Sequence, residues 1–103
     1  MSQYKILFDN LIWDESVKGM KSKILKKNDK QMRLVILYPE IESKWCEQGH
    51  YGYILEGEME LKFENEKILY QKGNGIFIPS GAEHKHKTKI LSEFVKIFFV
   101  EDI

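Results

Sequence analysis

The side chains that could bind a metal or transfer a proton are concentrated in the middle of the chain. All three histidines, His50, His84 and His86, and the only cysteine, Cys46, lie within residues 46–86. A single cysteine cannot form a disulfide within the chain, so Cys46 is a buried apolar side chain, a reactive thiol or a metal ligand. Thiolate and imidazole are ligands that zinc and related transition metals prefer. The clustering therefore indicates a functional site in this stretch.

Alternating patterns predict that the stretch consists of strands. From residue 58 to residue 64 apolar side chains alternate with charged ones, which is the period of a strand with one buried face. In residues 84–89 the three lysines share one parity, whereas His84, His86 and Thr88 share the other. Because lysine is rarely fully buried, we expect the two histidines to point inward.

The rest of the chain is predicted to form short strands separated by turns. Residues 21–27 and 32–38 are expected to form a hairpin around the turn residues Asn28 and Asp29. Pro39 ends the second of these strands because it donates no backbone hydrogen bond. Further strands are expected at residues 50–55, 58–63, 67–70, 76–78, 84–89 and 94–100. Many short strands without a helical period predict an all-β sandwich or barrel.

Length and charge narrow the class of protein. A chain of 103 residues can enclose one hydrophobic core, so we expect a single domain over residues 1–103, with an N-terminal arm at 1–20 and the barrel at 21–103. Within the arm, a short strand is one interpretation of residues 4–8. No apolar run approaches the roughly 20 residues that cross a bilayer, and the start does not resemble a signal peptide. We therefore expect a cytoplasmic protein that does not bind membranes.

The charge balance argues against nucleic acid as a partner. Sixteen basic residues balance sixteen acidic ones, and the formal net charge is zero. Arg33 is the only arginine, so the chain has little of the planar donor that favours phosphate and base-edge recognition. We expect no nucleic-acid partner.

Two stretches contain recognisable glycine-containing motifs. Gly73, Pro79, Gly81 and His84 are separated by five, one and two residues, and residues 53–58 are Tyr-Ile-Leu-Glu-Gly-Glu. The spacing from Gly73 to His84 resembles the second motif of the cupin superfamily, and residues 53–58 are similar to the end of its first motif. Members of that family are small barrels of two facing antiparallel sheets. The resemblance implies an all-β, cupin-type double-stranded β-helix.

The same resemblance implies a metal site formed by Cys46, His50 and His84. These residues depart from the family pattern. The family usually has a glutamate where this chain has His50, and it usually has two histidines where this chain has Lys44 and Cys46. Thr88 replaces the closing asparagine of the pattern. A thiolate and two imidazoles favour zinc, with iron, nickel and copper as alternatives, and leave a position for water or substrate.

Two more residues are candidates for catalysis. Lys44 could hold an anionic substrate or, if desolvated, act as an acid or base. His86 is a candidate general base or substrate contact on the same inward face as His84. The alternative for all of these side chains is structural, because a barrel that has lost its metal could retain them for packing or hydrogen bonding.

These observations lead to one main hypothesis and two alternatives. The main hypothesis is a small cupin that binds a divalent metal and a small anionic molecule, and that could be a metal-dependent enzyme such as a dioxygenase or isomerase. The first alternative is a sensor that binds a metabolite or sugar without turnover, since a fold does not decide function. The second is an oligomerisation barrel without a ligand. We expect a homodimer, because small cupins commonly pair and the apolar arm near Trp13 has little core of its own to enter.

Overall fold

The computed structural model describes residues 4–103, in which eight strands and two short 3-10 helices are present. The strands are β1 (Met20–Lys27), β2 (Lys30–Leu37), β3 (His50–Glu56), β4 (Glu58–Lys62), β5 (Lys67–Gln71), β6 (Gly75–Ile78), β7 (Lys87–Ile90) and β8 (Val95–Asp102). The 3-10 helices are η1 (Phe8–Asn10) and η2 (Ala82–His84). Within the described residues, no helix has both the length and the apolar character needed to cross a bilayer.

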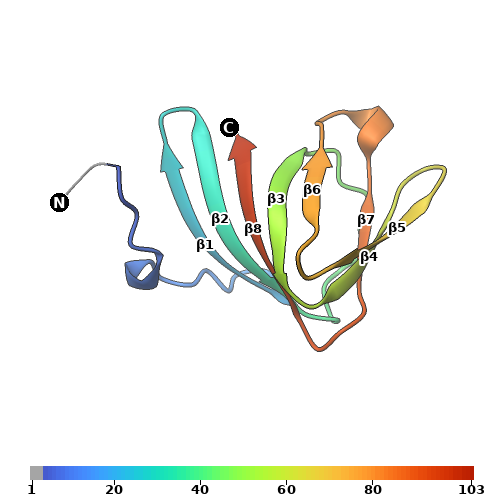
Figure 1. Ribbon diagram of the computed structural model, residues 1–103, viewed down its shortest axis with the longest axis horizontal. Helices are drawn as coiled ribbons and strands as arrows, with labels where there is room; N and C mark the ends of the chain where they lie inside the picture. The colour runs from blue at the N-terminus through green and yellow to red at the C-terminus, as the bar shows by residue number, and fades with distance from the viewer. Residues whose placement is uncertain (1–3) are drawn as a thin grey trace.

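The strands pair into two antiparallel sheets that lie face to face (Figure 1). The larger sheet has the order β1-β2-β8-β3-β6, and the smaller one has the order β5-β4-β7. Some neighbours in the larger sheet are far apart in the chain, since β2 and β3 each pair with the C-terminal β8. The prediction of an all-β fold with two facing antiparallel sheets is confirmed.

The first hairpin forms where the sequence predicted it. β1 and β2 pair from Met20 with Leu37 to Lys27 with Lys30. Asn28 adopts a φ of 58° in the connecting turn, which is a left-handed conformation that asparagine tolerates better than most residues.

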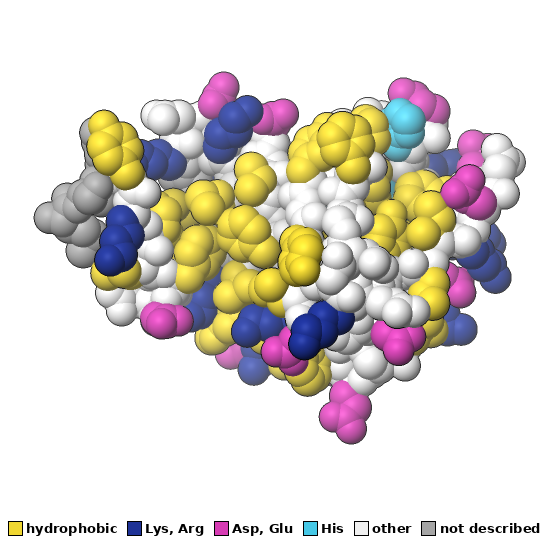
Figure 2. All heavy atoms as spheres, in the orientation of Figure 1, with side chains coloured by type: hydrophobic (Ala, Val, Ile, Leu, Met, Phe, Trp, Pro, Cys, Tyr) yellow, Lys and Arg dark blue, Asp and Glu magenta, His cyan; other side chains and the backbone are white. Residues whose placement is uncertain are grey.

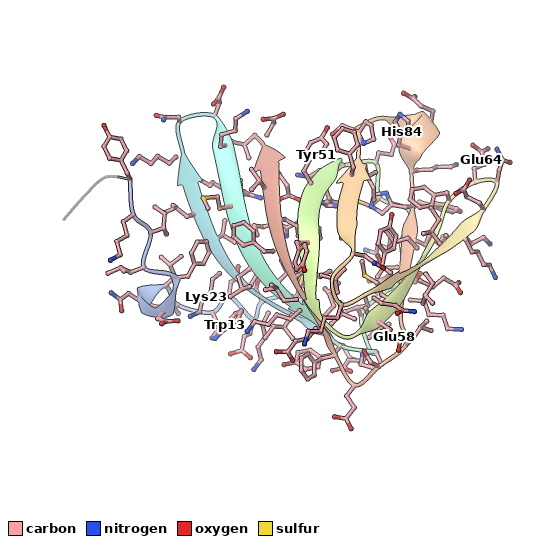
Figure 3. The ribbon with its side chains drawn as sticks, in the orientation of Figure 1. Trp13, Lys23, Tyr51, Glu58, Glu64 and His84 are labelled. Carbon is pink, nitrogen blue, oxygen red and sulfur yellow. The ribbon has the colours of Figure 1, made fainter. Side chains whose placement is uncertain are left out.

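Residues 4–8 do not form a strand. The chain instead turns through η1, and side chains of the arm contact the outer face of the larger sheet. The Phe8 ring lies 5.8 Å from the Phe98 ring in an edge-on arrangement. Lys23 Nζ donates a hydrogen bond of 2.9 Å to the Phe8 carbonyl oxygen and lies 4.9 Å from the Trp13 ring centroid (Figure 3).

The hydrophobic core lies between the sheets, on the inward parity of each strand. In β4, Met59 and Leu61 are buried while Glu58 and Lys62 are exposed, which confirms the predicted alternation. The core residues are Val35, Ile54, Met59, Leu61, Tyr70, Ile76, Ile78, Ile90, Val95, Ile97 and Phe99.

Gly52 allows the backbones of β3 and β8 to approach each other. A Cβ atom at Gly52 would lie 2.1 Å from the Phe98 carbonyl oxygen, which is backbone and cannot rotate away. We expect Gly52→Ala to lower the free energy of unfolding by about 1–3 kcal/mol, because the two strands must separate. Gly75→Ala is the matched control on β6, since its nearest neighbour would be 3.8 Å away. Urea unfolding of both variants measures the difference, and equal stability would contradict the close approach.

Candidate metal centre

Cys46 and His86 are brought together by backbone pairing just before β7 begins. Cys46 N donates to the His86 carbonyl oxygen at 2.8 Å, and His86 N donates to the Cys46 carbonyl oxygen at 3.0 Å. Residues that exchange both hydrogen bonds in an antiparallel pair project their side chains to the same face. The thiol and the imidazole therefore enter the space between the sheets from one side.

His50 reaches the same space from the opposite sheet. It is the first residue of β3, and its ring centroid lies 5.3 Å from that of His86. The Phe99 ring lies on the other side of the His50 ring, at 4.8 Å between centroids. The ligand atoms offered by Cys46, His50 and His86 lie within 4.8 Å of one another. The structure thus brings one thiol and two imidazoles together.

Hydrogen bonds to the Nδ1 atoms leave the other nitrogen of each ring for a ligand. His50 Nδ1 lies 2.5 Å from Glu101 Oε2, and His86 Nδ1 lies 3.1 Å from the His84 carbonyl oxygen. A carboxylate and a carbonyl only accept, so each Nδ1 carries the proton. The Nε2 atom of each ring is then the nitrogen that could bind a metal, and outer partners of this kind usually orient ligating histidines.

The environment of His86 favours its neutral form. Burial lowers the pKa of the His86 imidazole, and the nearby His50 lowers it further, whereas the hydrogen bond to the His84 carbonyl opposes these effects. A histidine must be neutral at the nitrogen that binds a metal, so the direction of this shift suits a ligand.

A buried carboxylate holds His50 in place. The Glu101 side chain is fully buried and receives hydrogen bonds from Arg33 Nε at 2.7 Å, Arg33 Nη2 at 2.8 Å and Gln31 Nε2 at 2.8 Å. Burial alone would raise the pKa of Glu101, but the hydrogen bonds from His50 and Arg33 and the charge of Arg33 outweigh burial and hold the pKa at about 2. An ionised Glu101 therefore fixes both the position and the tautomer of His50.

The three candidate ligands open onto a cavity between the sheets. The cavity has a volume of about 160 Å³, and Arg33 and Thr88 are its other polar lining residues. The remaining lining residues are apolar: Met20, Val35, Leu37, Met59, Leu61, Ile76, Ile78, Ile97 and Phe99. A bound ligand would therefore meet a mostly apolar wall with a few convergent polar groups.

His84 does not join the cluster. It belongs to η2, its side chain is 40% exposed, and its Nε2 lies 3.7 Å from Glu83 Oε1 (Figure 3). The reason is local, because residues 82–84 form a 3-10 helix and the strand alternation that was predicted from His84 begins only at His86. His84 contributes its carbonyl oxygen to the site through the hydrogen bond from His86.

Lys44 also lies apart from the cavity. Its side chain is 72% exposed, and its Nζ lies 3.4 Å from Glu42 Oε2. It is not among the residues that line the cavity between the sheets. The cationic group that the structure places in the cavity wall is Arg33.

Sequence reasoning missed Glu101 and Arg33. Their positions in the strand alternation could have revealed them. Glu101 lies on the same face of β8 as the buried residues Val95, Ile97 and Phe99. Arg33 likewise shares the parity of Val35 in β2. A charged residue on a buried parity needs a partner, and each of these two residues is the partner of the other.

Comparison with known proteins identifies the fold. A family model described as a cupin domain matches residues 33–93. No curated protein matches the chain. The fold is similar to that of the polyketide cyclase RemF from Streptomyces resistomycificus, with a TM-score of 0.76 and 17% identity over 99% of this chain and 80% of that one.

Two longer proteins have a similar fold. Apo-HppE matches 93% of this chain, with a TM-score of 0.74 and 16% sequence identity. An HTH_3 family transcriptional regulator from Vibrio cholerae matches 82% of this chain, with a TM-score of 0.65 and 17% sequence identity. The matches cover 56% and 51%, respectively, of those two proteins. At these identities the likeness concerns the fold.

Proposed function

Since the chain belongs to the cupin family, we propose that it binds a divalent metal through Cys46 Sγ and the Nε2 atoms of His50 and His86. The observation that carries the proposal is that each of these three residues offers one ligand atom, and that the three atoms lie within 4.8 Å of one another. His86 takes the place that family spacing would assign to His84. Three protein ligands leave at least one coordination position for water or a substrate.

The donor set favours zinc, with iron, nickel and copper as alternatives. One thiolate and two imidazoles suit borderline and soft divalent ions, and no carboxylate belongs to the set. Iron is supported by the similar fold of Fe(II) HppE, whose TM-score is 0.75 at 15% identity. A metal bound here would supply Lewis-acid activation of water or of a ligand oxygen.

The cavity favours a small ligand with one anionic group. Its 160 Å³ is close to the volume of about 150 Å³ that holds one benzene molecule in an engineered cavity. Among the described residues, Arg33 Nη1 makes no hydrogen bond, so it can donate to an anion. The apolar wall would hold the rest of the molecule.

Two functions are compatible with this site. The first is a metal-dependent enzyme, such as a dioxygenase or isomerase, in which the bound molecule is a substrate. The second is a sensor that binds a metabolite or sugar without turnover, and the fold that the chain shares with a transcriptional regulator supports it. The proposal of metal and small-molecule binding is common to both.

Metal analysis of protein purified without an affinity tag tests the metal site. We expect close to one equivalent of metal in the wild-type protein. Simultaneous replacement of Cys46, His50 and His86 by alanine is expected to remove it while the all-β circular dichroism spectrum is retained. Metal retained in full by that folded variant would overturn the proposed site.

A ligand screen separates the enzyme from the sensor. Small organic acids and sugars are incubated with the metal-loaded protein, with and without oxygen, and followed by mass spectrometry. Consumption of one compound supports the enzyme. A compound that raises the melting temperature without being consumed supports the sensor.

We expect a homodimer that forms through the outer face of the larger sheet. Antiparallel sheets commonly present a polar face to water, but here Met32, Val100, Tyr51 and Phe77 are register neighbours across β2, β8, β3 and β6. Phe77 is 78% exposed, and Figure 2 shows apolar side chains gathered over these strands. A two-fold axis can pack such a face against its own copy.

Phe77→Lys tests this face as a dimer interface. The variant is expected to be monomeric in light scattering at concentrations at which the wild-type protein is a dimer, since a buried unpaired lysine is unfavourable. Leu69→Lys is the matched control, because Leu69 is 49% exposed on the outer face of the other sheet. A dimer that persists in Phe77→Lys, or that is lost equally in Leu69→Lys, would place the interface elsewhere.

A further inference from the structure

Three lysines face one another across the whole width of the smaller sheet. Lys62, in the central strand β4, pairs with Lys67 of β5 on one side and with Lys87 of β7 on the other. Register partners project to the same face. Because Leu61 points into the core, this row lies on the outer face.

Like charges that lie directly opposite in a sheet destabilise it. Neighbouring strands are only about 4.8 Å apart, so the three lysine side chains leave the sheet from adjacent positions. Within residues 4–103 none of the three forms an ion pair with a carboxylate. The row therefore gathers positive charge that no ion pair neutralises within the described residues.

The row borders a depression in the surface. Lys62, Lys67, Lys87 and Lys89 line a hollow of about 190 Å³, together with the hydroxyl residues Ser43 and Thr88. Among the described residues, Glu60 is the one carboxylate that lines it, and Glu60 pairs in register with Lys89. Figure 2 shows cationic side chains at the right-hand edge of the molecule, where β5 and β7 lie in Figure 1.

Trp45 restrains one end of the row. The Lys87 ammonium lies 4.8 Å from the Trp45 ring centroid, and the Lys85 ammonium lies 5.1 Å from it. These cation-π contacts limit the freedom of Lys87, and so reduce the entropy that a ligand would have to remove on binding.

We propose that this lysine row is a binding site for a small molecule that carries a diphosphate group. Several point charges of one sign require a ligand with several negative oxygens, and lysine is a common phosphate-binding residue in its role as a point charge. The Ser43 hydroxyl, which also lines the hollow, can donate to one of the remaining phosphate oxygens. The site lies on the outer face of the smaller sheet and is separate from the proposed metal ligands in the interior.

Titration with inorganic pyrophosphate at low ionic strength tests the proposal. We expect binding that weakens as salt is added, and amide shifts in the NMR spectrum that are centred on residues 62, 67 and 87. Lys62→Gln is expected to lower the affinity by at least about tenfold, since the central charge of the row is removed. Lys26→Gln, on the exposed end of β1, is the matched control and is expected to bind as the wild-type protein does.

Two further measurements make the test decisive. Without any ligand, Lys62→Gln is expected to melt at a higher temperature than the wild-type protein at low salt, because the repulsion within the row is relieved. Citrate is expected to bind more weakly than pyrophosphate. Equal binding of citrate, unchanged binding in Lys62→Gln, or shifts centred on Cys46, His50 and His86 would overturn the diphosphate site.

Discussion

Glu101→Gln is expected to lower the free energy of unfolding by about 3–5 kcal/mol, which is the usual effect of removing one partner of a buried ion pair. Glu101 is fully buried and binds Arg33 through both carboxylate oxygens. The neutral amide would leave the guanidinium, only 16% exposed, without a counter-charge. Because domains of this size are stable by only about 5–15 kcal/mol, the loss is large. Urea unfolding in the presence of a chelator measures it in the metal-free protein.

Two controls assign this loss to the ion pair. Glu58→Gln removes an exposed carboxylate of β4 and is expected to change the stability by no more than about 0.5 kcal/mol. The double variant Arg33→Met with Glu101→Leu is expected to recover part of the lost stability, because apolar replacement of a buried pair is often tolerated. Recovery should be incomplete, since His50 Nδ1 loses its acceptor. If Glu101→Gln unfolds at the same urea concentration as the wild-type protein, the carboxylate does not hold the network together.

The second large effect concerns which histidine belongs to the proposed metal site. His86→Ala is expected to lower zinc affinity by more than the roughly 10–100-fold that loss of an outer-shell partner causes, because a ligand itself is removed. His84→Ala is expected to change the affinity by less than about threefold, because its side chain lies outside the cluster and its backbone carbonyl remains. Competition with a chromophoric chelator measures both variants.

Cobalt substitution adds a readout that does not depend on affinity. A thiolate ligand gives Co²⁺ a charge-transfer absorption in the near ultraviolet, so the band is expected in the wild-type protein and in His84→Ala, and is expected to disappear in Cys46→Ser. Loss of metal in His84→Ala, together with full retention of metal in His86→Ala, would contradict His86 as a ligand. That result would favour Cys46, His50 and His84, the ligands that family spacing implies.

The strand pattern could be predicted because it is local. Met59 and Leu61 alternate with charged residues, and the turn residues Asn28 and Asp29 precede the apolar run at 32–38, so the prediction needed only residues that are close together in the chain. The clustering of Cys46 and the histidines in the sequence indicated the right part of the fold. Residues 4–8 could not be predicted in this way, because their conformation depends on where Phe8 meets Phe98 in the finished sheet.

The residues that hold His50 in place could not be predicted, because they come from strands that are distant in the sequence. Glu101 reaches His50, which is 51 positions away in the chain, only because β8 lies beside β3 and β2. The burial that lowers the pKa of His86, and the cavity that the ligands share, likewise exist only once two sheets face each other.

The amino-acid sequence was sufficient to predict the all-β pattern, the resemblance to cupins and a clustering of thiol and imidazole side chains in residues 46–86. The identity of the third converging side chain depended on the assembled sheets. A strand that begins three residues later, after the 3-10 helix at residues 82–84, leaves His84 at the surface and places His86 beside Cys46. Alternation predicts which side chains share a face only within a residue range that forms a strand. Where that strand begins is decided by its pairing with distant segments of the chain.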